Sequence, residues 1–239
     1  MTINVPEAAA HPPVPYGTPE APRIAVRGEA HLEADPETAT IYVTVRARGG
    51  SRRSALDDLT RRNVAVLDLV KAYPDAVESL ETGSFSIRPE FSKQGRGERV
   101  RSYHGHVRII AEFTDFTALG ELITRLADLE FTEVNGPMWA LRQTSPVHRE
   151  ARKQAVREAV QRAREYAEAL GTTLAALVEV ADTGVEQPVP YGYSPSPGGA
   201  FGVGRGAGAG EAAPLDLEPQ RQSVHAQVVA RFTMVPPQL

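Results

Sequence analysis

Residues 23–47 read RIAVRGEAHLEADPETATIYVTVRA, and this stretch decides the fold class. Apolar and polar residues alternate on both sides of the Asp35-Pro36-Glu37 turn, and a period of two is typical of half-buried strands. The apolar set is Ile24, Val26, Gly28, Ala30 and Leu32 before the turn, and Ala39, Ile41, Val43, Val45 and Ala47 after it. The stretch therefore predicts a β-hairpin with one apolar face on each strand.

A helix is expected after Gly49-Gly50. Ser54 with Asp57 three residues later is typical of a helix start, and apolar residues at helical spacing continue up to Pro74. A second strand pair follows, because apolar and polar residues alternate again. Its apolar residues are Val77, Phe85, Ile87 and Phe91 on the way out, and Tyr103, Val107, Ile109, Ala111 and Phe113 on the return.

Two further helices and three further strands complete the predicted order. Asp115 is expected to cap a short helix, and a strand lies around Trp139. The clearest helix has Ser145 as its N-cap, Pro146 as its first residue and Gly171 just past its end. A stripe of small side chains inside it would allow close packing on a sheet. The stripe consists of Ala151, Ala155, Ala159, Ala163 and Ala167, and strands follow at 177–180 and 224–234.

The order ββαββαβαββ predicts an α+β fold, with a largely antiparallel sheet built from strand pairs and with helices packed on one face. Residues 1–22 contain six prolines and are expected to form a disordered arm. Residues 23–235 are expected to form one domain. Within that domain, the Gly/Pro-rich residues 184–213 are expected to be a flexible insert.

Composition excludes several classes of protein. The 239 residues include no cysteine, which excludes thiolate nucleophiles, zinc ribbons and iron–sulfur clusters. The net charge of −4 gives no reason to expect nucleic acid as a partner, and no run of about 18 apolar residues predicts a membrane span. The first 22 residues lack both the basic start and the apolar stretch of a secretory signal, so the cytoplasm is the expected location.

Candidate chemistry is sparse in this sequence. His104 and His106 lie two apart on a strand and would share a face, but no third ligand is near, so a polar strand face is expected instead of a metal site. The glycines between Gly198 and Gly210 lack the flanking strand and helix of a phosphate cradle, so no cofactor is predicted. No Gly-x-Ser-x-Gly occurs. We therefore predict no catalytic residue and no enzyme.

The pentapeptide PVPYG occurs twice, at 13–17 and at 188–192, each time in a Pro-rich segment. Proline favours an extended polyproline II conformation, and the tyrosine of each copy could anchor it in a groove. Two interpretations stay open: chance within a biased composition, or paired elements that bind a neighbouring subunit or a partner. The candidate interaction residues are Pro13, Pro15, Tyr16, Pro188, Pro190 and Tyr191.

The chain resembles the SIMPL domain family over about residues 23–235. The resemblance rests on Val26-x-Gly28, on TGSFSIRPEF at 82–91, on Tyr103 and on the Ala-rich helix that ends at Gly171. The family includes bacterial periplasmic immunogenic and oxidative-stress-defence proteins. Membership implies an α+β fold and, in bacterial relatives, closed oligomers. It implies no established enzymatic activity and no known ligand residues.

We therefore expect a non-enzymatic protein that forms a homo-oligomer and acts as a binding or scaffold module, since open sheet edges are pairing templates. A role in stress tolerance is implied by the resemblance alone. The alternative is an adaptor that holds a protein client through the Pro-rich arm and the Gly-rich loop. Recovery of a distinct stoichiometric partner in a pull-down would favour the adaptor.

Overall fold

The computed structural model describes residues 17–92, 99–182 and 215–238. Among these, no helix is long and apolar enough to cross a membrane. The predicted arm at 1–22 and the predicted insert at 184–213 lie largely outside the described residues, and the predicted domain bounds stay predictions.

The described residues divide into two compact units. We call one the α3 unit, whose described residues are 17–32, 146–182 and 224–238. We call the other the α1–α2 unit, whose described residues are 33–92, 99–145 and 215–223.

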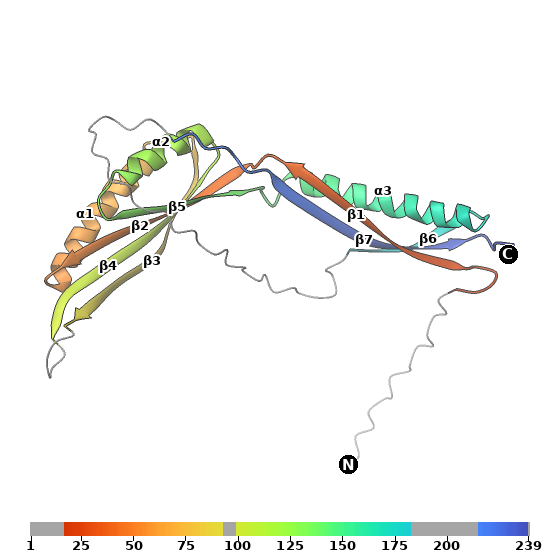
Figure 1. Ribbon diagram of the computed structural model, residues 1–239, viewed down its shortest axis with the longest axis horizontal. Helices are drawn as coiled ribbons and strands as arrows, with labels where there is room; N and C mark the ends of the chain where they lie inside the picture. The colour runs from red at the N-terminus through yellow and green to blue at the C-terminus, as the bar shows by residue number, and fades with distance from the viewer. Residues whose placement is uncertain (1–16, 93–98, 183–214, 239) are drawn as a thin grey trace, which may run out of the picture. The chain divides into compact units, whose positions relative to one another are not determined.

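Three helices and seven strands are present in the described part of the chain, in the predicted order ββαββαβαββ. They are β1 (Arg23–Ala34), β2 (Thr38–Gly49), α1 (Arg52–Lys71), β3 (Val77–Phe91), β4 (Val100–Phe113), α2 (Phe116–Ala127), β5 (Thr132–Ala140), α3 (Pro146–Ala169), β6 (Leu174–Asp182) and β7 (Gln222–Met234). These elements confirm the α+β class (Figure 1).

The α1–α2 unit contains a four-stranded sheet of order β3-β4-β2-β5, in which every neighbouring pair is antiparallel. Strand β2 is central, so Val43 lies opposite Ile109 of β4 and Val134 of β5. Strand β3 forms one edge of this sheet.

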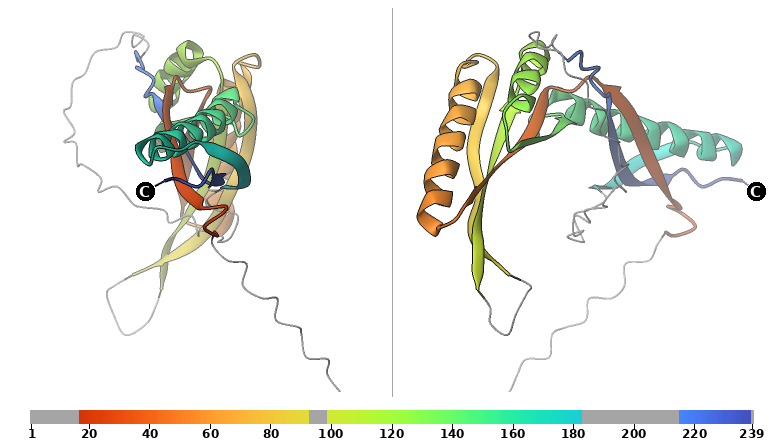
Figure 2. Two further views of the ribbon diagram at one scale, coloured as in Figure 1. Left: turned by 90° about the vertical axis from the view of Figure 1, so that its right-hand side faces the viewer. Right: turned by 60° about the vertical axis from the view of Figure 1, so that its left-hand side comes forward.

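One face of this sheet carries the core of the unit, and α1 and α2 both pack on that face. The alternating apolar residues of β2 are at most 3% exposed. They share one cluster with Leu59 and Val66 of α1 and with Leu119 and Leu122 of α2. Figure 2 shows α1 running alongside the strands. The opposite face of β2 and β4 carries mainly polar side chains, with Ile110 as an apolar exception.

The predicted hairpin of β1 and β2 is wrong, because the two strands belong to different sheets. Both sides of β2 are occupied, by β4 and by β5, so no open edge remains for β1. The residues of the expected turn make other contacts: the Glu37 carboxylate accepts hydrogen bonds from the Ser145 hydroxyl (2.8 Å) and the Arg142 amide (3.1 Å). Alternation identifies a strand and its buried face, but not its partner.

The α3 unit contains a three-stranded sheet of order β1-β7-β6, covered by α3. The predicted alanine stripe is confirmed: all five alanines are buried, and three of them join the core with Val26, Ala30 and Val228. Close approach is enforced at Gly28. A Cβ on that residue would lie 2.0 Å from the Ala155 carbonyl oxygen and 2.6 Å from the Ala159 nitrogen.

The ends of the three helices test the capping residues that the sequence predicts. The predicted start of α1 at Ser54 is wrong, because Ser51 is the N-cap and its hydroxyl and that of Ser54 each accept from the other residue's amide at 3.1 Å. The Asp115 cap of α2 is confirmed, since its carboxylate accepts from two amides of the first turn. Helix α3 begins at Pro146 as predicted, and Gly171 follows it with φ +68°.

Candidate functional site

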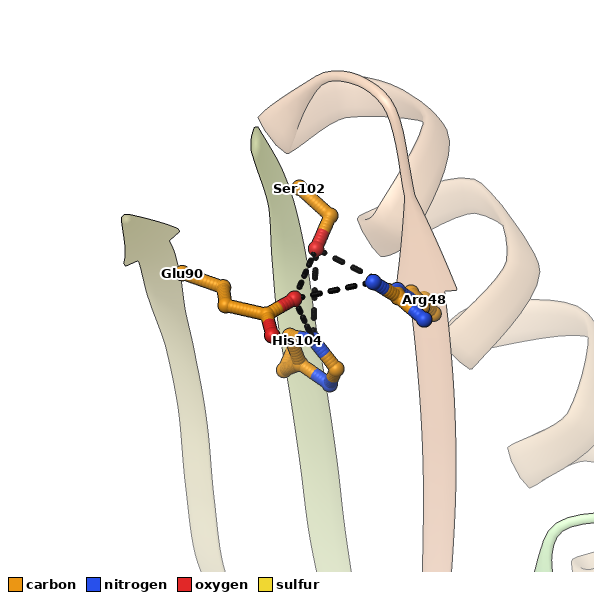
Figure 3. A network of polar contacts seen from close by, with 4 residues as sticks. All are labelled: Arg48, Glu90, Ser102 and His104. Atoms are coloured by element: carbon orange, nitrogen blue, oxygen red, sulfur yellow. Dashed lines mark hydrogen bonds and ion pairs between the residues drawn. The ribbon is translucent and has the colours of Figure 1, made fainter. Parts of the chain in front are cut away.

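The densest polar cluster that we describe lies on the outer face of the four-stranded sheet, near the ends of three strands. Strand register builds it: Glu90 of β3 lies opposite Ser102 of β4, and His104 of β4 lies opposite Arg48 of β2. Figure 3 shows the four side chains converging from these three strands. We call them the Glu90 network.

One carboxylate oxygen, Glu90 Oε2, is the hub of the network. It accepts hydrogen bonds from the Ser102 hydroxyl at 2.5 Å, from the Arg48 guanidinium at 2.9 Å and from His104 Nε2 at 2.9 Å. The hydrogen bond from Ser102 and then that from His104 lower the pKa of Glu90 from 4.5 to about 2, and the charge of Arg48 adds to the effect. Glu90 is therefore ionised at neutral pH.

The Glu90 network brings together a serine, a histidine and a carboxylate, but not in the arrangement of a hydrolase. In a catalytic triad the serine and the carboxylate bind different ring nitrogens of the histidine. Here His104 Nε2 faces both Ser102 Oγ (3.3 Å) and Glu90 Oε2 (2.9 Å). The Ser102 hydroxyl donates its hydrogen bond to the Glu90 carboxylate and not to the imidazole. The network joins three strands, and its geometry differs from that of a triad.

His104 and His106 lie on the outer face, as the alternation predicts. His106 lies one row along from the Glu90 network, opposite Arg46 of β2 and Ser86 of β3. Arg46 binds Glu133 at 2.6 Å. No group of three His, Asp or Glu side chains that could hold an ion occurs within residues 17–92, 99–182 and 215–238.

A different kind of site lies on β6, an edge strand of the three-stranded sheet. Three of its apolar side chains are exposed: Leu177 at 57%, Val178 at 42% and Val180 at 45%. The strand carries no Lys, Arg or Pro, the residues that commonly protect an edge from pairing. Its one central charge, Glu179, is bound to Arg231 of β7 at 2.5 Å. We call this surface the β6 edge.

A groove of about 410 Å³ adjoins the β6 edge. Its walls come from the second half of α3, including Val160 and Ala167, and from the start of β6, including Leu174 and Leu177. Phe232 of β7 also lines it. The alanine stripe seats α3 over β1 and β7, so the apolar side of β6 is left partly uncovered.

Sequence reasoning missed both features for the same reason. Apart from Ser102 and His104, which lie two positions apart on β4, the bonded partners in the Glu90 network are 12 to 54 positions apart, and only strand register brings them together. Strand β6 was recognised as a strand, but consecutive apolar residues are typical of a buried strand, and its edge position is a property of the whole sheet. The candidate interaction residues Pro13, Pro15, Tyr16, Pro188, Pro190 and Tyr191 all lie outside the described residues.

Comparison with known proteins agrees with this architecture. The model of the SIMPL family, described as "Protein of unknown function (DUF541)", matches residues 24–232. The chain belongs to the SIMPL family. It is 25% identical over 178 residues to the 26 kDa periplasmic immunogenic protein of Brucella melitensis, covering 72% of this chain and 71% of the relative. It is also 21% identical over 163 residues to uncharacterized protein YggE of Edwardsiella ictaluri, covering 68% of each chain.

A solved structure of a putative amidohydrolase/peptidase from Burkholderia cenocepacia matches 56% of this SIMPL-family chain and 33% of its own. The identity is 18% and the TM-score is 0.23, a value too low to carry an inference.

The family relatives correct one expectation. The Brucella melitensis and Brucella abortus proteins are both named periplasmic, which contradicts the cytoplasmic location predicted for this chain. That prediction was only a default, drawn from the lack of a recognisable secretory signal in residues 1–22.

Proposed function

We propose that this SIMPL-family protein is a non-enzymatic scaffold that assembles with copies of itself through the β6 edge, in the periplasm. The exposed apolar residues of β6 are the observation that carries the proposal. The periplasmic location is supported by the names of the Brucella relatives. A contribution to stress tolerance is supported only by the family resemblance.

Strand pairing offers β6 a specific way to become covered. The outer edge of β6 carries backbone donors and acceptors that are not used by β7, and such an edge is a template for another strand. A second β6 that pairs antiparallel across a two-fold axis would join two three-stranded sheets into one. Each exposed Leu or Val that becomes covered stabilises the assembly by about 1 kcal/mol, because roughly half of its surface is still available for burial.

The opposite edge of the same sheet supports this choice of surface. The outer face of β1 carries a charged or imidazole side chain at five of its six positions, Arg23, Arg27, Glu29, His31 and Glu33, and Ala25 at the sixth. Charges on an edge strand disfavour pairing with another apolar strand. The two edges of one sheet therefore differ in their tendency to associate, and β6 is the edge that is open to a partner.

A lack of turnover is supported by the Glu90 network. Its serine donates to the carboxylate and its histidine offers one nitrogen to both neighbours, so the strongest candidate cluster has no activated nucleophile. Binding and assembly are functions that need only the surfaces described above.

The test is the native mass of the full chain, measured by light scattering after size-exclusion chromatography. The wild-type protein is expected to be a homo-oligomer at micromolar concentration. Introduction of two charges, Val178→Lys with Val180→Lys, is expected to shift it to a monomer. Ala25→Lys on the exposed outer face of β1 is the matched control and is expected to keep the oligomer, while circular dichroism checks that each variant is folded.

A monomeric wild-type protein, or a double variant of unchanged mass, would contradict assembly through β6. Recovery of a distinct stoichiometric protein in a pull-down, together with a monomeric chain, would favour the adaptor instead.

A further inference from the structure

The β3–β4 hairpin ends in a small apolar surface that the core does not use. Phe91 and Val100 lie opposite each other and are 47% and 43% exposed. The ladder continues past them, because the Ser92 amide donates to the Arg99 carbonyl at 2.9 Å. Neither apolar residue belongs to the core cluster of the α1–α2 unit. A third exposed apolar residue, Phe85 at 57%, lies further back on β3.

Three arginines lie close in sequence to Phe91 and Val100. Arg88, Arg99 and Arg101 are all exposed, and none of the three side chains makes an ion pair or a hydrogen bond with another described residue. Glu90 is the one carboxylate among residues 85–92 and 99–104, and the Glu90 network already holds it through Arg48. Among the described residues, these three guanidinium groups have no paired carboxylate. We call four residues, Phe91, Arg99, Val100 and Arg101, the hairpin end, because Phe85 and Arg88 lie further back on β3, opposite Val107 and His104.

We propose that the hairpin end docks on an anionic lipid bilayer. Phe91 and Val100 would enter the boundary between headgroups and acyl chains, where aromatic and apolar side chains are favourable. The arginines would bind lipid phosphates while their aliphatic stems lie along the apolar region. The net charge of −4 gives the whole chain no long-range attraction to such a surface, so local charge and apolar contact together determine the docking.

The size of the hairpin end favours a bilayer over an acidic protein. A stable protein interface buries about 800 Å² on each partner and needs a complementary shape. Two paired side chains at the end of a two-stranded ribbon present much less than that. A bilayer needs no shape complementarity, and its surface charge is continuous, so a small apolar tip with flanking arginines is sufficient for reversible binding. This inference does not depend on assembly through β6.

Co-sedimentation of the full chain with lipid vesicles tests the proposal. We expect binding to vesicles of equal parts phosphatidylcholine and phosphatidylglycerol, no binding to phosphatidylcholine alone, and weaker binding as salt is raised. Arg99→Gln with Arg101→Gln is expected to weaken the partition coefficient about 30-fold, since each arginine contributes about 1 kcal/mol at an anionic surface. Phe91→Ser is expected to weaken it about tenfold.

Matched controls separate the hairpin end from general charge and apolarity. Arg149→Gln with Arg152→Gln removes the same charge from exposed positions of α3, and Met138→Ser removes an apolar side chain that is 51% exposed. Both controls are expected to bind anionic vesicles as the wild type does. The assembly variant Val178→Lys with Val180→Lys is expected to retain binding by each copy of the chain.

Several results would overturn the proposal. These are a wild-type protein that stays in the supernatant with anionic vesicles, equal binding to neutral vesicles, and equal losses in the α3 control and the hairpin variant. Binding to soluble poly-glutamate that Phe91→Ser does not change would identify an acidic protein as the partner instead.

Discussion

The two units bury their helices in opposite ways. In the α1–α2 unit the space between sheet and helices is filled by large side chains, among them Phe113, Ile41 and Leu122, all fully buried. In the α3 unit the corresponding space is nearly absent, because alanines of α3 face Gly28 and Ala30 of β1. The first unit is held by apolar volume and the second by close backbone approach.

This difference has an energetic consequence. Burial of apolar area stabilises the folded state by roughly 25 cal/mol per Å². A helix–sheet interface of alanine and glycine therefore stabilises its unit less per residue than one of leucine and phenylalanine. The close packing of α3 on β1 and β7 also leaves the third strand of the sheet, β6, partly uncovered. The small apolar volume of this core and the exposure of the β6 edge therefore both follow from the alanine stripe.

The largest expected effect is the loss of volume in the α1–α2 unit. Phe113→Ala should lower the free energy of unfolding by about 3–5 kcal/mol, because it removes a fully buried ring and leaves a cavity. Trp139 is the single tryptophan of the chain and packs edge-to-face on Phe116, so its fluorescence in urea reports this unit. Phe85→Ala, at an exposed phenylalanine, should change stability by less than about 1 kcal/mol. Equal effects of the two variants would contradict the assignment of Phe113 to the core.

The addition of a single methyl group should destabilise the α3 unit. Gly28→Ala should destabilise it by about 3 kcal/mol, since the new Cβ would meet the backbone of α3 at a distance that no atom pair tolerates. Hydrogen exchange of the α3 amides measures the effect in that unit, while Trp139 fluorescence reports the other unit. Gly50→Ala is the control, because nothing lies within 4 Å of a Cβ there. Unchanged hydrogen exchange of the α3 amides would show that a Cβ at residue 28 fits between β1 and α3.

The contrast between the units also shows what sequence could predict. Alternation identified both strands of the opening stretch and their buried faces, and the spacing of Ala151 to Ala167 identified the buried stripe of α3. These are local properties, set by periods of two and of about four residues. The partner of β1 is not local: it pairs with β7, which lies almost 200 positions later. For the same reason the sequence predicted neither the Glu90 network nor the open edge of β6.

The two sheets also differ in how they hold an exposed glutamate. The smallest expected effect on stability concerns this difference. Glu90 accepts from three side chains, whereas Glu179, on the three-stranded sheet, has the single ion pair with Arg231. Because the pKa of Glu90 falls from 4.5 to about 2 on folding, its stabilising effect is fully present above about pH 5 and is lost as pH falls towards 2. Glu90→Gln should therefore lower the urea midpoint at neutral pH, and its difference from wild type should shrink between pH 4.5 and 2. Glu179→Gln corrects for the loss of one exposed Glu–Arg pair. A difference for Glu90→Gln that stays constant through this pH range would show that the network does not hold the carboxylate ionised.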